Sequence, residues 1–125
     1  MTLLDTSIFI ALFRRRHLGI GERVKDLIIQ NEAYICGQVW VEYLGGFRSA
    51  SRRKMYAEQL SSLPWLSTTR EAFEFAADLQ AMHQSLNSAD AIIAATAILQ
   101  DAQLLTIDKD FASLREYGVE IVELN

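Results

Sequence analysis

The chain has 125 residues, half of them hydrophobic and only one of them proline, which excludes a disordered chain and predicts one globular domain over residues 1–125. Its single cysteine, Cys36, excludes an internal disulfide and is typical of a cytoplasmic protein. Asp5 interrupts the apolar run at the N-terminus and no apolar stretch reaches membrane-spanning length, so we expect neither a signal peptide nor a membrane partner.

The net charge of −4 is unevenly placed along the chain. Residues 1–54 hold nine Lys and Arg against five Asp and Glu, whereas residues 55–125 hold three against eleven. A basic face beside a cluster of acids suits a phosphate-backbone ligand that approaches a metal site. Solvated helix faces would explain any one of these charges, but they explain the uneven pattern less well.

Short apolar runs alternate with helical patterns along the whole chain. Five runs predict strands, at residues 2–5, 33–36, 65–68, 104–107 and 119–124. Apolar stripes predict helices at residues 7–16, 22–30, 39–48, 51–63, 71–85 and 89–99, with a short helix from Asp108. Gly19 and Gly21 are expected to break the chain before the second helix, and Pro64 to end the fourth. This alternation, without a hairpin signal, predicts an α/β fold with a parallel sheet and helices on both faces.

The first predicted strand ends at a carboxylate. Asp5 directly follows the apolar residues Leu3 and Leu4, and in open α/β sheets the ligand crevice lies beyond the carboxyl ends of the strands. Asp, Ser and Thr are all good helix caps, so Asp5 could serve only to cap the following helix. Because Ser7 can cap that helix by itself, we favour a functional role for Asp5.

Four further acids interrupt apolar patterns or follow a strand. Glu42 interrupts the run VWVEYL, Asp90 lies in the first turn of ADAIIAATAIL, and Asp108 and Asp110 follow the fourth strand in LLTIDKDF. Each has a simpler explanation: Asp90 could only complement the helix dipole, and Asp108 could only cap a helix. Asp110 could be only a first-turn acid of that helix.

Glu42 is the most informative of these acids. Gly45 and Gly46 lie three and four residues beyond it, on the same face of the predicted helix. Two glycines destabilise a helix. They could clear space beside the carboxylate for a substrate backbone, or they could simply end the helix early.

If the first and fourth strands are neighbours, Asp5 and Asp108 lie at one sheet edge, with Asp90 at a nearby helix start. Carboxylates that converge in this way repel one another, so a cation must neutralise them. Oxygen ligands without cysteine or paired histidine select Mg²⁺ or Mn²⁺, and such a site suits metal-assisted hydrolysis of a phosphodiester. The hydroxyls of Ser7 and Thr106 are accessory candidates, which could orient a ligand or a metal-bound water, or serve only as cap and strand end.

These motifs together resemble the PIN-domain nucleases. The resemblance rests on LLDTSIFI, on Glu42, on SADAIIAATA around Asp90 and on LLTIDKDF, in this order and over the whole chain. Within the family, the chain is most similar to the VapC-type toxins of bacterial type II toxin–antitoxin pairs. The family often has a glycine in the turn after the Asp90 helix, where this chain reads Asp101-Ala102-Gln103, a departure that affects turn geometry and not chemistry.

The resemblance implies a PIN-like domain with strand order 3-2-1-4-5 and an endoribonuclease that depends on Mg²⁺ or Mn²⁺. It implies catalytic roles for Asp5, Glu42, Asp90 and Asp108. The metal would be held by Asp5, Asp90 and Asp108, with Asp110 as an accessory in some members. It also implies a homodimer, an RNA substrate and a cognate antitoxin whose arm occludes the site.

The basic residues of the first half are candidates for binding the RNA backbone or the antitoxin: Arg14, Arg15, Arg16, Arg48, Arg52, Arg53 and Lys54. Two other enzyme and signalling classes fit less well. A haloacid-dehalogenase-type phosphatase needs an Asp where this chain has Ser7, and a receiver domain needs a phosphoacceptor Asp near Ser49-Ala50-Ser51-Arg52. A housekeeping PIN nuclease of RNA processing and a non-catalytic domain with an acidic pocket are the remaining alternatives.

Overall fold

Five short strands form one parallel sheet in the order β3-β2-β1-β4-β5 in the computed structural model, which describes residues 1–14 and 18–122. The strands are β1 (Thr2–Leu4), β2 (Ala33–Cys36), β3 (Trp65–Leu66), β4 (Gln103–Thr106) and β5 (Val119–Ile121). The predicted α/β class and the strand order are therefore confirmed.

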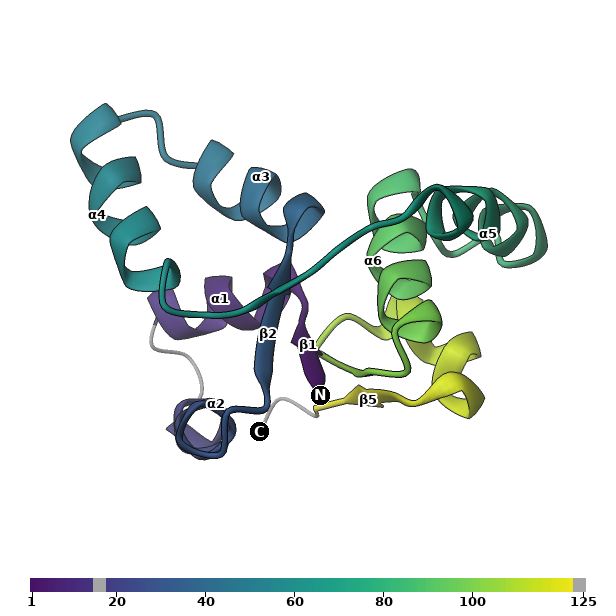
Figure 1. Cartoon of the computed structure of the whole chain (residues 1–125), viewed down its shortest axis with the longest axis horizontal. Coiled ribbons are helices and arrows are strands. Elements are labelled where there is room, and N and C mark those ends of the chain that lie inside the picture. Colours follow the sequence, from purple (N-terminus) through teal and green to yellow (C-terminus); the bar gives the residue numbers. More distant parts are fainter. Residues whose placement is uncertain (15–17, 123–125) are drawn as a thin grey trace.

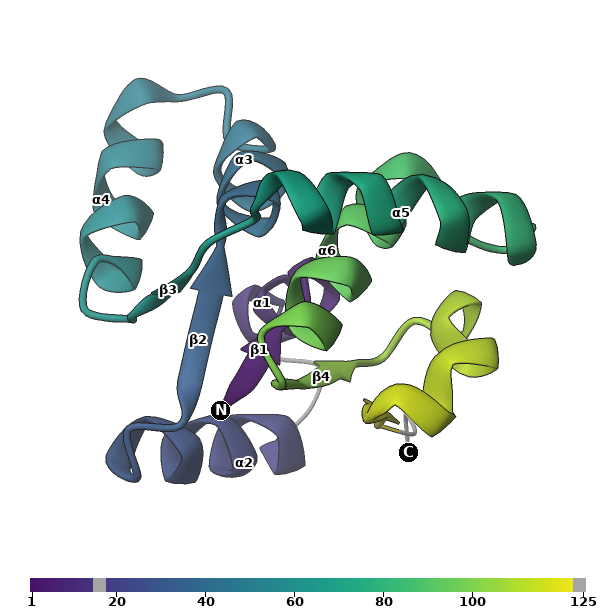
Figure 2. The ribbon, with the colours of Figure 1, turned by 45° about the vertical axis from the view of Figure 1, so that its right-hand side comes forward.

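Helices connect these strands and cover the sheet (Figure 1). They are α1 (Thr6–Phe13), α2 (Leu18–Ile29), α3 (Gly37–Gly45), α4 (Ala50–Leu60), α5 (Arg70–Met82), α6 (Ser88–Leu99) and the 3₁₀ helix η1 (Lys109–Tyr117). Figures 1 and 2 show α3 and α4 side by side beyond the carboxyl end of β2, with α2 near the opposite end of that strand. None of the described helices is both long and apolar enough to cross a membrane.

The centre of the sheet consists of fully buried apolar side chains. Leu3 and Leu4 of β1, Ile35 of β2 and Leu104 and Leu105 of β4 are each at most 1% exposed. A parallel sheet that is covered on both faces buries every side chain of its central strands, which is why these strands read as continuous apolar runs.

The register of β1 against β4 decides which residues meet at the carboxyl edge of the sheet. Leu4 pairs with Leu105, and the Asp5 amide donates to the Leu105 carbonyl at 3.0 Å. Asp5 and Thr106 are the next residues along these two strands. The expected adjacency of the first and fourth strands is confirmed, and it places Asp5 beside the residues that follow β4.

The first helix is shorter than predicted. α1 ends at Phe13 with Arg14 as its C-cap, and does not extend to Arg16. The chain reads Arg14-Arg15-Arg16 after Phe13, so a further turn would add no apolar side chain to the buried face. Of the basic residues predicted to bind RNA or antitoxin, Arg15 and Arg16 lie outside the described residues.

The prediction that Gly19 and Gly21 break the chain is wrong. Both lie in the first turn of α2, which begins at Leu18. Ile20 and Val24 of this helix are 2% and 5% exposed. Burial of these side chains outweighs the cost of about 1 kcal/mol that each helical glycine carries relative to alanine.

Two other helix boundaries follow local capping. α3 ends at Gly45 with Gly46 as its C-cap, which supports the simpler explanation that these glycines end the helix. α6 begins at Ser88 and is capped by Asn87, whose side chain accepts from the Asp90 amide. β5 ends at Ile121 in the described part of the chain.

Candidate active site

Asp5 directly follows β1 and is the N-cap of α1. Its Oδ2 accepts a hydrogen bond from the Ser7 amide at 3.4 Å and from the Ser7 hydroxyl at 2.6 Å. The expectation that Ser7 caps this helix is therefore wrong, because Ser7 lies in the first turn and its side chain reaches back to Asp5. The cap is compatible with both a structural and a functional role of Asp5. The other contacts of its carboxylate must distinguish these two roles.

Two hydroxyls, one from α1 and one from β4, hold the Asp5 carboxylate. Thr106 Oγ1 donates to Asp5 Oδ2 at 2.7 Å, alongside the Ser7 hydroxyl. Thr106 Oγ1 also accepts from the Asp108 amide at 3.0 Å, and Ser7 Oγ accepts from the Ile107 amide at 3.2 Å. Both accessory residues thus orient Asp5 and tie it to the segment that carries Asp108.

The start of α6 and the start of η1 bring three acids together. One carboxylate oxygen from each of Asp90, Asp108 and Asp110 lies within 4.8 Å of the other two. Asp108 caps η1, because its Oδ1 accepts from the Asp110 amide at 2.9 Å. Within the described residues, no other set of three or more His, Cys, Asp or Glu side chains converges in this way.

Asp5 and Glu42 lie outside this set of three, but their charges reach it. The pKa of Asp90 is raised to about 7, first by burial and then by the charges of Asp108, Asp5 and Glu42. Asp90 is only 8% exposed, so water screens these charges poorly. The four acids named as catalytic from the sequence therefore act on one another across four different elements.

Asp5 and Glu42 are also perturbed. Burial raises the pKa of Asp5, which is 4% exposed, although the hydrogen bonds from Ser7 and Thr106 lower it. Partial burial and then the charge of Asp5 raise the pKa of Glu42, an exposed residue of α3. Strongly perturbed acids in one place are typical of a functional site.

Sequence reasoning missed two residues that contact Glu42. Thr6 Oγ1 donates to Glu42 Oε1 at 3.2 Å, and the Gln38 side chain also hydrogen-bonds to Glu42. The four-residue spacing from Gln38 to Glu42 on a predicted helix is a signal that could have found the contact of Gln38. Nothing in the sequence points to the contact of Thr6, because it depends on how α1 packs against α3.

The basic candidates do not share one role. Arg14, Arg48, Arg52 and Lys54 are exposed. In contrast, Arg53 Nη1 donates to the carbonyls of Phe47 at 2.6 Å and Arg48 at 3.2 Å, which binds the start of α4 to the segment that follows α3. These contacts with the main chain give Arg53 a structural role.

The donor set of this site fits a hard divalent cation. Carboxylate oxygens from the starts of α6 and η1 converge, and the charges of Asp108, Asp5 and Glu42 raise the pKa of Asp90. A cation would relieve this repulsion, and ligands that are all oxygen suit Mg²⁺ or Mn²⁺ better than zinc.

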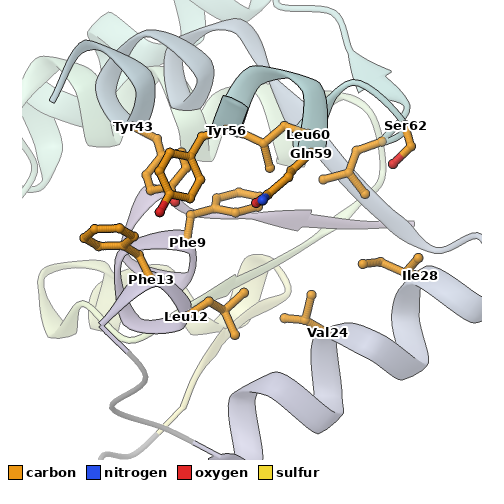
Figure 3. Close-up of a pocket in the computed structure, with 11 residues that line it drawn as sticks. Phe9, Leu12, Phe13, Val24, Ile28, Tyr43, Tyr56, Gln59, Leu60 and Ser62 are labelled. Atoms are coloured by element: carbon orange, nitrogen blue, oxygen red, sulfur yellow. The ribbon is translucent and has the colours of Figure 1, made fainter. Parts of the chain in front are cut away.

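A separate apolar pocket of about 420 Å³ lies between α1, α2 and α4 (Figure 3). Figure 3 shows Val24 and Ile28 of α2 facing Leu60 of α4, with Phe9 of α1 between them. None of the acids described above lines this pocket, which therefore forms a second feature of the molecule.

A parallel 3-2-1-4-5 sheet with carboxylates just beyond the ends of its central strands defines an α/β protein with a cluster of acids at one sheet edge. The sequence profile of the PIN domain matches residues 2–117, so the chain belongs to the PIN domain family. No curated protein sequence matches the chain significantly.

Several solved structures have the same fold. A toxin–antitoxin complex from Klebsiella pneumoniae contains a chain with a TM-score of 0.83 and 26% identity, which covers 98% of this chain and 99% of that one. VapBC2 from Rickettsia felis, bound to a DNA fragment from its promoter, matches with a TM-score of 0.79 and 16% sequence identity. The match covers 98% of each chain. VapBC-5 from Mycobacterium tuberculosis, of the VapBC family of toxin–antitoxin systems, matches with a TM-score of 0.68 and 22% sequence identity. The match covers 98% of this chain and 97% of that one.

The raised pKa of Asp90 predicts that the metal-free protein loses stability as the pH rises. An unfolded Asp titrates near pH ~3.9, whereas Asp90 in the folded chain titrates at about 7. Between these values the folded state keeps a proton that the unfolded state has lost, so the free energy of unfolding falls with rising pH. Asp90→Asn should therefore be more stable than the wild type at pH 8, by on the order of 1–2 kcal/mol, and no more stable near pH 4.

Urea unfolding in EDTA between pH 4 and pH 8 measures this difference. The matched control is Asp78→Asn, which changes an exposed acid of α5 and should leave the pH profile parallel to that of the wild type. If the stability of Asp90→Asn changed with pH in parallel with that of the wild type, the raised pKa of Asp90 and the repulsion among the four acids would be contradicted.

Proposed function

We propose that this protein is an endoribonuclease that depends on Mg²⁺ or Mn²⁺ and acts as the toxin of a toxin–antitoxin pair. The observation that carries the proposal is the perturbed group formed by Asp5, Glu42, Asp90 and Asp108 in a chain of the PIN domain family. PIN-domain nucleases are generally hydrolases that act on nucleic acids, and the structural matches include toxin–antitoxin complexes.

In this proposal Asp5, Asp90 and Asp108 hold the metal ion, with Asp110 as an accessory ligand. The oxygens of Asp90, Asp108 and Asp110 converge, and the charge of Asp5 acts on Asp90. The bound ion would lower the pKa of a water molecule and stabilise charge on the phosphoryl oxygens. Ser7 and Thr106 fix the orientation of the Asp5 carboxylate.

Glu42 has a different role from the metal ligands. Glu42 is more exposed than Asp5 and Asp90, and partial burial and the charge of Asp5 raise its pKa. A carboxylate with a raised pKa is a better proton acceptor than an ordinary one. We assign it the proton of the attacking water, which Glu42 would accept as phosphorus is attacked.

Two alternatives differ in partner or in activity. A housekeeping nuclease of RNA processing would share the site but lack an antitoxin, so a small adjacent reading frame that encodes a DNA-binding protein would favour the toxin. A non-catalytic domain with an acidic pocket would bind metal without cleaving RNA.

Asp5→Asn and Asp90→Asn should each lower RNA cleavage about 100-fold or more, because each removes a charged ligand. Both variants should stay folded, since Asn is also a good helix cap and causes no repulsion. Cleavage of labelled RNA with Mn²⁺ measures activity, and thermal melting with EDTA or Mn²⁺ measures metal binding.

Mn²⁺ should raise the melting temperature of the wild type and of Asp78→Asn, but not that of Asp5→Asn. Cleavage by purified Asp5→Asn at the rate of the wild type, in a preparation free of other nucleases, would end the metal-nuclease proposal.

Exposed basic residues of α4 would bind the RNA backbone or the antitoxin. Changing Arg52 and Lys54 to Ala should weaken RNA binding and reduce its log–log salt slope by about 0.7 for each lost contact with a single strand. The rate at saturating RNA should change little, because binding that is equal in ground and transition states affects KM alone. Arg53 is left intact because it binds the main chain of Phe47 and Arg48.

Fluorescence anisotropy of a labelled RNA at several salt concentrations measures the slope. Lys25→Ala is the control, because this exposed lysine lies on α2 and not on the basic first turn of α4 (Figure 2). An unchanged slope in the Arg52→Ala, Lys54→Ala variant would assign these residues to the antitoxin or to solvent.

The apolar pocket between α1, α2 and α4 suits an apolar segment of the antitoxin. Helices that leave an open apolar groove commonly receive a partner's side chains at helical spacing. Ile28 lines the pocket and is 46% exposed, while the neighbouring Ile29 is 68% exposed and does not line it.

Ile28→Asp should weaken the complex with the protein encoded by the adjacent small reading frame by at least about tenfold, because it places a charge in an apolar contact. Ile29→Asp should leave affinity unchanged. Titration calorimetry of the purified partners measures both, and equal effects of the two variants would place the antitoxin elsewhere.

The expected homodimer has a separate candidate surface. Val41 of α3, Trp65 of β3 and Phe73 of α5 are exposed large apolar side chains, and all three line one shallow pocket. An exposed apolar patch of this kind is typical of a protein interface.

A further inference from the structure

We propose that Thr6 is a positioning residue for Glu42, an inference that rests on the proposed function. Thr6 is the first residue of α1 and is 9% exposed. Its Oγ1 donates to Glu42 Oε1 at 3.2 Å, across a sequence separation of 36 residues. This hydrogen bond joins the helix that follows Asp5 to the helix that carries Glu42.

The hydroxyl of Thr6 is not needed to cap α1. Asp5 is the N-cap of that helix, and its carboxylate accepts from the backbone amides of both Thr6 and Ser7. A threonine at a helix start often bonds to nearby backbone groups, but here its side chain contacts a different helix. The Thr6 hydroxyl has one hydrogen-bond donor, and it donates to the Glu42 carboxylate.

The Glu42 carboxylate needs hydrogen-bond donors to keep its position, because the like charge of Asp5 repels it. The Thr6 hydroxyl and the Gln38 side chain hydrogen-bond to its carboxylate, and the charge of Asp5 acts on it as well. The first two are neutral donors and the third is a like charge. Without these donors, a long and exposed side chain would turn toward water and away from Asp5.

Gln38 and Thr6 hold Glu42 from different directions. Gln38 lies one turn earlier on α3, so it moves together with Glu42 and cannot place α3 relative to the other acids. Thr6 follows Asp5 directly in the chain, so its contact fixes the Glu42 carboxylate relative to the proposed metal ligand. This difference makes Thr6 the residue that sets the distance between Glu42 and the other acids.

Three substitutions test this role. Thr6→Val removes the hydroxyl but keeps the branched shape, and should lower kcat about tenfold with little change in KM, because a misplaced catalytic group affects the chemical step. Thr6→Ser keeps the hydroxyl and should stay within about twofold of the wild type. Thr96→Val is the matched control, because it removes a buried hydroxyl that bonds to Thr68 and to the Ile92 carbonyl, and should leave kcat unchanged.

A double-mutant cycle separates positioning from a general effect on stability. Thr6→Val should have no further effect on kcat in a Glu42→Ala background. The same cycle is measured for Mn²⁺ affinity by titration calorimetry of the metal-free proteins. There Thr6→Val should weaken binding about threefold only when Glu42 is present, since a displaced charge attracts the cation less. Thermal melts of each variant report whether it is folded.

Each outcome supports or overturns the inference. Equal effects of Thr6→Val with and without Glu42, or equal losses in Thr6→Ser and Thr6→Val, would leave Thr6 a purely structural role. If the wild type cleaves RNA and binds Mn²⁺, and Thr6→Val does both equally well, then the role of Thr6 is rejected and the proposed function stands. A wild type that does neither rejects the proposed function, and the inference falls with it.

Discussion

The mutual repulsion of buried carboxylates is the constraint on which the rest of this structure depends. Asp5 and Asp90 are almost fully buried, and the charges of Asp5, Glu42 and Asp108 all raise the pKa of Asp90. Burying one ion without a counter-charge is costly, and burying several together is more so. The fold must therefore hold these groups against a force that pushes them apart, and it does so with the rigid centre of a parallel sheet.

Neutral hydroxyl groups orient two of the acids. Ser7 and Thr106 donate to the Asp5 carboxylate, and Thr6 donates to the Glu42 carboxylate. A basic side chain in these positions would stabilise the metal-free protein, but it would also compete with a cation for the carboxylates. Hydroxyl groups orient the same oxygens without cancelling their charge, so the attraction for a cation is kept.

Much of the fold follows from local pattern, whereas the finer parts of the site follow from packing. The apolar runs around Leu3 and Leu104 predicted buried parallel strands, because strands covered on both faces cannot alternate with polar residues. Burial of Ile20 overrode the helix-breaking tendency of Gly19. The contact of Thr6 with Glu42 could not be predicted, since it depends on the approach of two helices that are distant in sequence.

The position of Asp5 at a helix cap restricts how such a site can be lost in evolution. This one side chain closes the start of α1 and belongs to the acidic group, so most replacements would damage folding and chemistry together. Asparagine is the exception, because it caps a helix nearly as well as aspartate and carries no charge. A lineage that discards the activity but keeps the domain as a binding protein would therefore pass most easily through a single amide substitution at the end of its first strand.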